Sequence, residues 1–179
     1  MTLLKENFYN ELDFETEEFL NSIKEEFKNY PYSELAIIIS SYRALKNLFY
    51  SYHWTASGES SYSDHLLFER IYESFEGYED QAAEKLLALG GSPLLLNPIL
   101  LSKASHRFIH KIETCDCPNI TSAAKGHKAI KLFIQITDSL RNTLRQKGNL
   151  STGTDNLLGD ILDSQEKNLY LLERRIRES

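Results

Sequence analysis

Residues 53–91 read HWTASGESSYSDHLLFERIYESFEGYEDQAAEKLLALGG, and this stretch predicts the organisation of the whole chain. From Tyr62 to Leu89 it contains no proline and a single glycine, Gly77. Its apolar residues recur every three to four positions, which is typical of an amphipathic helix. The pair Gly90-Gly91 is expected to end this helix, because glycine commonly follows the last helical turn.

Four polar side chains of this predicted helix share one stripe. With His65 at zero, a turn of ~100° per residue puts Glu69 at roughly 40°. The same turn puts Asp80 at about 60° and Glu84 at about 100°. His65 and Glu84 are nineteen residues apart, roughly 28 Å at ~1.5 Å per residue, so one helix cannot bring both to one metal ion.

Two antiparallel copies of the helix can bring these residues together. The numbers of His65 and Glu84 sum to 149, and so do those of Glu69 and Asp80. One two-fold axis near positions 74–75 therefore matches both pairs, as in a contact that uses the same surface on both subunits. The pattern predicts two identical sites, each with side chains from both copies.

His53 can add a second imidazole, because it lies at the end of the preceding predicted helix, twelve residues before His65. Imidazole and carboxylate ligands without thiolate suit iron or another first-row divalent ion. Each carboxylate taken alone is as readily an ordinary solvated charge, since most acidic side chains are exposed. The hypothesis of a metal site rests on the joint spacing and symmetry.

The same stretch resembles the motif of a known family. The matching positions are His53, Trp54, Gly58, His65, Phe68, Glu69, Tyr72, Asp80, Ala83, Glu84, Leu89, Gly90 and Gly91. This pattern is similar to that of the Dps family, the ferritin-like mini-cages named as DNA-binding proteins from starved cells.

The resemblance implies roles for individual residues. His53, His65, Asp80 and Glu84 match the ferroxidase ligands of the family, and Glu69 stands where the family usually has Asp. Trp54 matches a tryptophan that the family places to take up stray oxidising equivalents, although packing in a core or interface explains it equally well. The family's iron-admitting pores are lined by the start of the last helix, where the candidates are Asp155, Asp160 and Asp163.

The resemblance also implies the fold and the function. The fold is all-α, a four-helix bundle with a short crossover helix between its second and third helices, assembled from two-fold dimers into a hollow dodecamer. The implied function is oxidation of ferrous iron, usually by hydrogen peroxide, and storage of ferric oxide, with zinc or manganese as surrogate metals. No histidine has a glutamate three residues before it, so the within-bundle site of ferritins is not expected.

Composition and charge restrict the alternatives. The chain has 179 residues, is 41% hydrophobic and carries a formal net charge of -6. We expect an acidic leader at 1–30 and one bundle domain at 31–179. No apolar run is long enough to span a membrane and no secretory signal is recognisable, so a cytoplasmic protein is expected.

Two alternative functions stay open at this point. The first is a nucleoid-protecting DNA-binding protein, which the net charge and the lack of a lysine-rich tail disfavour. The basic residues of 119–147 can contact DNA, but ion pairs or a solvated face explain them better. The second is a cage protein with a vestigial metal site, which the Glu69 substitution keeps open.

One further group of residues stands apart from the family motif. His106 and His110 are four residues apart, and Cys115 and Cys117 follow them. Two histidines at this helical spacing with two thiols can bind zinc, although a polar helix face and inert thiols are the simpler interpretation.

The remaining helices follow from apolar periodicity and from capping and breaking residues. Ser33 is expected to cap the first bundle helix, and Pro98 to begin the crossover helix. The predicted ranges are 15–29, 33–56, 98–112, 119–147 and 155–177.

Overall fold

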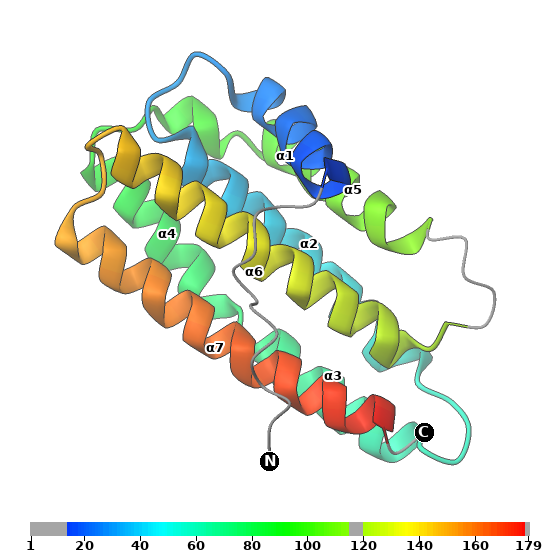
Figure 1. Cartoon of the computed structure of the whole chain (residues 1–179). Coiled ribbons are helices and arrows are strands. Elements are labelled where there is room, and N and C mark those ends of the chain that lie inside the picture. Colours follow the sequence, from blue (N-terminus) through cyan, green and yellow to red (C-terminus); the bar gives the residue numbers. More distant parts are fainter. Residues whose placement is uncertain (1–13, 115–119, 178–179) are drawn as a thin grey trace.

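The computed structural model describes residues 14–114 and 120–177, and over these ranges it contains helices and no strand (Figure 1). The helices are α1 (Phe14–Phe27), α2 (Ser33–Thr55), α3 (Ser61–Glu73), α4 (Glu76–Ala88), the 3₁₀ turn η1 (Pro93–Leu96), α5 (Pro98–Glu113), α6 (Ser122–Gln146) and α7 (Thr152–Arg177). The all-α prediction is confirmed.

Four helical rods form the bundle: α2, the pair α3 and α4, α6 and α7. α2 lies against α3, α4, α5 and α6, and α6 packs along α7. The crossover helix α5 carries the chain back along the bundle, so that α6 runs in the same direction as α3 and α4 (Figure 1). This is the predicted bundle with a crossover helix between its second and third rods.

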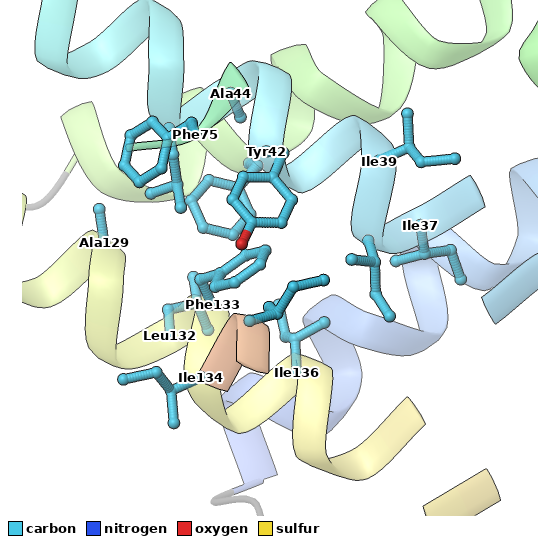
Figure 2. Packing of buried hydrophobic residues seen from close by; sticks show 14 of the residues in the cluster. Ile37, Ile39, Tyr42, Ala44, Phe75, Ala129, Leu132, Phe133, Ile134 and Ile136 are labelled. Atoms are coloured by element: carbon cyan, nitrogen blue, oxygen red, sulfur yellow. The ribbon is translucent and has the colours of Figure 1, made fainter. Parts of the chain in front are cut away.

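Aromatic rings fill the centre of the bundle. Figure 2 shows the Tyr42 ring of α2 between Phe75 and Phe133. The ring centroids of Tyr42 lie 5.7 Å from Phe75 and 4.7 Å from Phe133, and all three side chains are fully buried. Helix α1 adds Leu20, Ile23 and Phe27 to the same core, which fixes it on α2, α5 and α6. The division at residue 30 stays a prediction.

The long helix predicted from Tyr62 to Leu89 is wrong in one respect, because Ser74 and Phe75 divide it into α3 and α4. The Ser74 hydroxyl donates to the Ile71 carbonyl oxygen at 2.7 Å and accepts from Asn168 Nδ2 of α7 at 3.0 Å. The Ser74 amide also bonds to Ile71, which tightens the turn to three residues. A serine held in this way bends a helix.

The glycine pair ends α4 as predicted. Gly90 has a φ of 86°, and its amide bonds to the Leu87 carbonyl while that of Gly91 bonds to Leu86. These two bonds are the Schellman motif, which needs a left-handed residue at this position. The motif therefore ends α4 at Ala88, about one turn after the predicted ligand Glu84.

The start of α2 differs from the prediction, whereas the start of α5 agrees with it. Ser33 is the first helical residue, and the capping position belongs to Tyr32, which is left-handed with a φ of 61° and makes no side-chain cap. Pro98 does begin α5, where the Asn97 side chain accepts hydrogen bonds from the amides of Ile99 and Leu100.

Candidate metal centre

Two predicted ligands, His53 and His65, lie together in the structure. Their rings stack with centroids 3.6 Å apart and an angle of 25°. His53, at the end of α2, is only 9% exposed, whereas His65 of α3 is exposed. The antiparallel packing of α2 on α3 produces this contact, and the turn between them includes Gly58 at a φ of 85°.

The two imidazoles exchange hydrogen bonds with each other's backbone. Nδ1 of His53 lies 3.0 Å from the carbonyl oxygen of His65, and Nδ1 of His65 lies 3.0 Å from that of His53. A carbonyl oxygen only accepts, so each Nδ1 carries the proton and donates it. The Nε2 atom of each neutral ring is then left with a free lone pair, which is the form that binds a metal ion.

The three predicted carboxylates do not converge on this histidine pair within one chain. Glu69 is half-buried on α3, one turn after His65, whereas Asp80 and Glu84 are exposed on α4. Across the described ranges no group of three histidine, cysteine or acidic side chains is close enough to hold one metal ion. One copy therefore supplies only part of the predicted ligand set at either end of the α3 and α4 rod.

An aromatic group borders the histidines, and we call Tyr72, Tyr50 and Trp54 the aromatic ladder. The Tyr72 ring meets His53 edge-on at 5.4 Å and stacks on Tyr50 at 4.0 Å, and Tyr50 lies 5.5 Å from Trp54. Trp54 is 73% exposed, so it does not pack in the core of a single chain. Sequence reasoning gave Trp54 a role and matched Tyr72 to the family motif without giving it one, but it missed Tyr50, although the spacing of Tyr50 and Trp54 by one helical turn was a signal.

Glu69 also acts on the aromatic ladder. Loss of solvation, and next the nearby charge of Glu69, raise the pKa of Tyr72 above its usual range. Tyr72 therefore stays a neutral phenol at physiological pH, beside both the imidazole of His53 and a carboxylate. A phenol in this position can give up an electron and a proton together if the carboxylate accepts the proton.

The three pore candidates occupy different environments. Arg141 donates to Asp155 at 2.5 Å and Arg145 lies 3.4 Å away, so the Arg141 hydrogen bond holds the pKa of Asp155 below its usual range. Asp163 pairs with Lys167 at 2.5 Å. These partners offset the two carboxylate charges, which weakens the case for either residue as a cation guide.

Asp160 shares a cavity with a predicted ferroxidase ligand. The cavity, about 470 Å³ in volume, lies between α4 and α7, and Glu84 and Asp160 both line it. Lys85 also lines it, and its Nζ lies 3.3 Å from where a side chain on Gly153 would begin. Of the three candidates, Asp160 is thus the one that the fold brings near Glu84.

The second histidine group lies elsewhere, on α5. His106 and His110 are both exposed, and their ring centroids are 6.2 Å apart. Cys115 and Cys117, which were considered with them, lie outside the described residues. The structure therefore keeps the histidines of this group apart from the His53 and His65 pair.

Comparison with known proteins agrees with this fold. A sequence model of the ferritin-like domain family matches residues 33–178. A DNA protection during starvation protein of Brevibacillus brevis is 24% identical over 132 residues, which cover 69% of this chain and 79% of the relative. General stress protein 20U of Bacillus subtilis is 38% identical over 56 residues, or 31% of this chain and 39% of the relative.

Solved Dps structures share the fold along most of their length. Dps from Thermosynechococcus elongatus superposes with a TM-score of 0.67 at 19% identity, covering 88% of this chain and 94% of that one. The Dps protein of Vibrio cholerae O1 gives a TM-score of 0.64 at 19% identity, covering 90% and 91%. That protein is described as a member of a broad superfamily of ferritin-like diiron-carboxylate proteins.

A matched domain that spans the whole bundle defines the class: the chain belongs to the ferritin-like domain family. Within that class its relatives and structural neighbours include Dps proteins, which confirms the resemblance found in residues 53–91. None of the helices in the described ranges is both long and apolar enough to cross a membrane.

Proposed function

We propose that this protein is a cytoplasmic iron-storage ferroxidase that oxidises ferrous ions at sites shared between two copies of the chain. The observation that supports it best is the reciprocal hydrogen bonding of His53 and His65. This contact occupies both Nδ1 atoms and leaves both Nε2 atoms free. Histidines that only filled space would not need their tautomers fixed in this way.

The second copy is expected to lie antiparallel on α3 and α4. Both helices have 13 residues, and the ends of α3 pair with those of α4 under the same sum of 149 that pairs the ligands. The break at Ser74 and Phe75 then lies on the proposed two-fold axis. The bend therefore does not disturb the proposed pairing, because α3 of one copy faces α4 of the other on both sides of the break.

Exposed apolar side chains support the same pairing. Tyr62 is 76% exposed and Leu87 is 45% exposed, and their numbers also sum to 149. Leu66, which is 44% exposed, matches Ala83. In the proposed dimer these side chains would bury one another beside the ligands, which excludes water from the site and stabilises the contact.

Iron is the substrate of the proposed reaction. His65 and Glu69 would hold one ferrous ion, while His53 with the partner's Asp80 and Glu84 would hold the other, with Glu84 bridging. Two adjacent ferrous ions can each give one electron to a single hydrogen peroxide molecule. Its oxygen–oxygen bond breaks, two protons complete two water molecules, and two ferric ions remain for deposition as oxide inside a cage, proposed to be a dodecamer.

The aromatic ladder suits protection of the protein. When one ferrous ion meets peroxide, only one of the two electrons comes from iron. Tyr72 can supply the second, with its proton passing to Glu69, and Trp54 at the outer end of the ladder can then take up the oxidising equivalent. With less than one iron per site, Trp54→Phe is expected to increase hydroxyl radical captured by a spin trap without slowing iron oxidation.

DNA binding is the alternative function, and the ion pairs weigh against it. Of the basic residues on α6 and just after it, Lys125 pairs with Glu113, Arg141 and Arg145 with Asp155, and Lys147 with the buried Glu34. These three carboxylates offset part of the positive charge of the most basic stretch. A gel-shift assay at physiological salt is expected to show little binding, and a tight, salt-sensitive complex would favour the DNA-binding role instead.

The decisive experiment is anaerobic loading with ferrous iron followed by hydrogen peroxide, with ferric absorbance as the readout. Wild-type protein is expected to oxidise about two irons per peroxide, and His65→Ala and Glu84→Ala to be slow. His127→Ala is the matched control, because His127 lies on α6 and is not one of the proposed ligands. Oxidation no faster than in buffer would mean that the ligand set is vestigial.

A further inference from the structure

The exposed face of α5 presents two imidazoles one helical turn apart. His106 and His110 project from the side of α5 opposite the residues that it buries against the bundle, such as Ala104 and Phe108. Their ring centroids lie 6.2 Å apart with an angle of 56°. The proposed ferroxidase chemistry uses neither ring.

This separation agrees with two ligands of one metal ion. Zinc–imidazole bonds are ~2.1 Å long, and a ring centroid lies about 1 Å behind its nitrogen, so two rings on one ion have centroids no more than about 6.5 Å apart. That limit applies when the two nitrogens lie on opposite sides of the ion, whereas a tetrahedral angle puts the centroids about 5 Å apart, so the observed 6.2 Å has to close by about 1 Å. A small side-chain rotation brings both nitrogens to tetrahedral positions, because neither ring is packed in the core.

Thr114 helps to orient one of the rings. Its hydroxyl donates to the His110 carbonyl oxygen at 2.6 Å and lies 3.4 Å from His110 Nδ1. With its proton engaged, the hydroxyl oxygen is available as an acceptor for a proton on Nδ1. His110 then has Nε2 free, as when a neighbouring acceptor orients a metal-binding histidine.

The positive charges near the pair are largely offset. Arg107 pairs with Glu26 at 2.8 Å and Lys111 with Glu15 at 3.3 Å, so α1 supplies a carboxylate to each. Lys103 lines a cavity of about 460 Å³ together with His106, so its positive charge also lies near the pair. Its ammonium group is on a flexible chain in water, where screening limits the penalty.

We propose that His106 and His110 form a second metal site, which binds a nitrogen-seeking divalent ion such as Zn²⁺, Ni²⁺ or Cu²⁺. Two neutral imidazoles without a carboxylate favour these ions over Fe²⁺, which lies lower in the order of affinities. Water completes the coordination on the open face of the helix. The site therefore differs from the proposed ferroxidase centre in its place on the fold and in its metal preference.

The test is a Cu²⁺ titration followed by electron paramagnetic resonance, made on full-length protein with its thiols alkylated and in the His65→Ala background. Alkylation removes sulfur ligands, and His65→Ala disables the other histidine pair. We expect one Cu²⁺ per chain with hyperfine coupling to two nitrogens. Adding His106→Ala or His110→Ala should weaken Cu²⁺ binding by about tenfold or more. Loss of a residue that only hydrogen-bonds to a metal ligand already lowers metal affinity ~10–100-fold, and loss of a ligand itself should cost at least as much.

His127→Ala, added to the same background, is the control and should leave the titration unchanged, because His127 has no histidine one turn away. Circular dichroism confirms that each variant stays helical, and His106→Gln repeats the test with a polar residue. A His65→Ala protein that binds no Cu²⁺, or whose coupling is unaffected by both α5 substitutions, would disprove the site. The result does not depend on iron oxidation, so it can fail or succeed separately from the proposed function.

Discussion

The Nδ1 atoms of His53 and His65 each lie 3.0 Å from the backbone carbonyl oxygen of the other residue. The backbone of each residue thus holds the ring of the other, and the two rings stack with centroids 3.6 Å apart. Removal of either imidazole deletes one proposed ligand and the stacking partner of the other ring, whose backbone acceptor remains. We expect His53→Ala, His65→Ala and the double variant to lose ferrous oxidation to a similar extent, at least about tenfold each, because groups that act as a unit are not additive. Stopped-flow absorbance measures the rates, and losses that multiply in the double variant would show that the rings act independently.

Leu87 tests the proposed pairing of copies. Leu87→Glu leaves every proposed ligand in place but puts a charge on the part of α4 that the proposed dimer would bury. Burial of a leucine contributes ~1.5–3 kcal/mol, and two-fold symmetry counts the loss twice, so the dissociation constant should rise roughly a hundredfold or more.

Analytical ultracentrifugation measures the assembly of this variant, and ferrous oxidation should decline with it. Leu94→Glu is the matched control, since Leu94 is an exposed leucine in η1 outside the proposed face. If Leu87→Glu protein assembles and oxidises iron normally, the copies pair through another surface.

Substitution of glycine by alanine should have opposite effects on stability at Gly126 and at Gly159. A Cβ on Gly126 would lie 2.9 Å from the Phe49 ring, where α6 crosses α2, whereas a Cβ on Gly159 would have no atom within 4 Å. Gly126→Ala should therefore lower the free energy of unfolding by ~1–3 kcal/mol through overpacking. Gly159→Ala should raise it by up to ~1 kcal/mol, because alanine favours the helix. Urea titration of both variants compares them, and a shift in the same direction would contradict the packing at Phe49.

Glu113 should make stability depend on pH. Burial alone would raise the pKa of Glu113, but hydrogen bonds from Lys125 and Tyr52 outweigh it and hold the pKa below its usual value. The unfolded chain then binds more protons at moderately acidic pH, so this stabilisation is present above the ordinary glutamate pKa of ~4.3 and is lost as the pH falls through the lower folded value.

The matching variant is Glu113→Gln, which keeps the shape and removes the charge. At pH 7 this substitution should lower the free energy of unfolding by ~0.5–1 kcal/mol. The effect is modest because the ion pair between Lys125 and Glu113 is partly solvated. Urea titrations should show a smaller difference in the free energy of unfolding between wild type and variant at pH 3.5 than at pH 7. An equal difference at both pH values would exclude the carboxylate charge as its origin.

Helix order and helix ends were largely predictable from the sequence, because they depend on local chemistry. The apolar period placed the rods, and Pro98 and the Gly90-Gly91 pair set two ends that the structure confirms. The left-handed turn at Tyr32 was not predictable in this way, since aromatic residues seldom adopt it and Ser33 offered a conventional cap.

Features that depend on distant partners were missed. Ser74 breaks the long helix with help from Asn168, 94 residues further along the chain. Asp155 looked like a free carboxylate at a helix start, but Arg141 from the preceding helix neutralises it. The histidines were proposed as ligands from their type and spacing, whereas their reciprocal hydrogen bonds required the packed geometry of α2 on α3.

The equal lengths of α3 and α4 have a consequence for how this rod can change in evolution. A single inserted residue before the break at Ser74 and Phe75 would shift His65 relative to the axis without shifting Glu84. Because every chain of the proposed dimer presents both halves of the rod to its partner, that one insertion would damage both proposed sites at once. Only a matching insertion after the break would restore the register, so we expect length changes in this rod to occur in symmetric pairs or not at all.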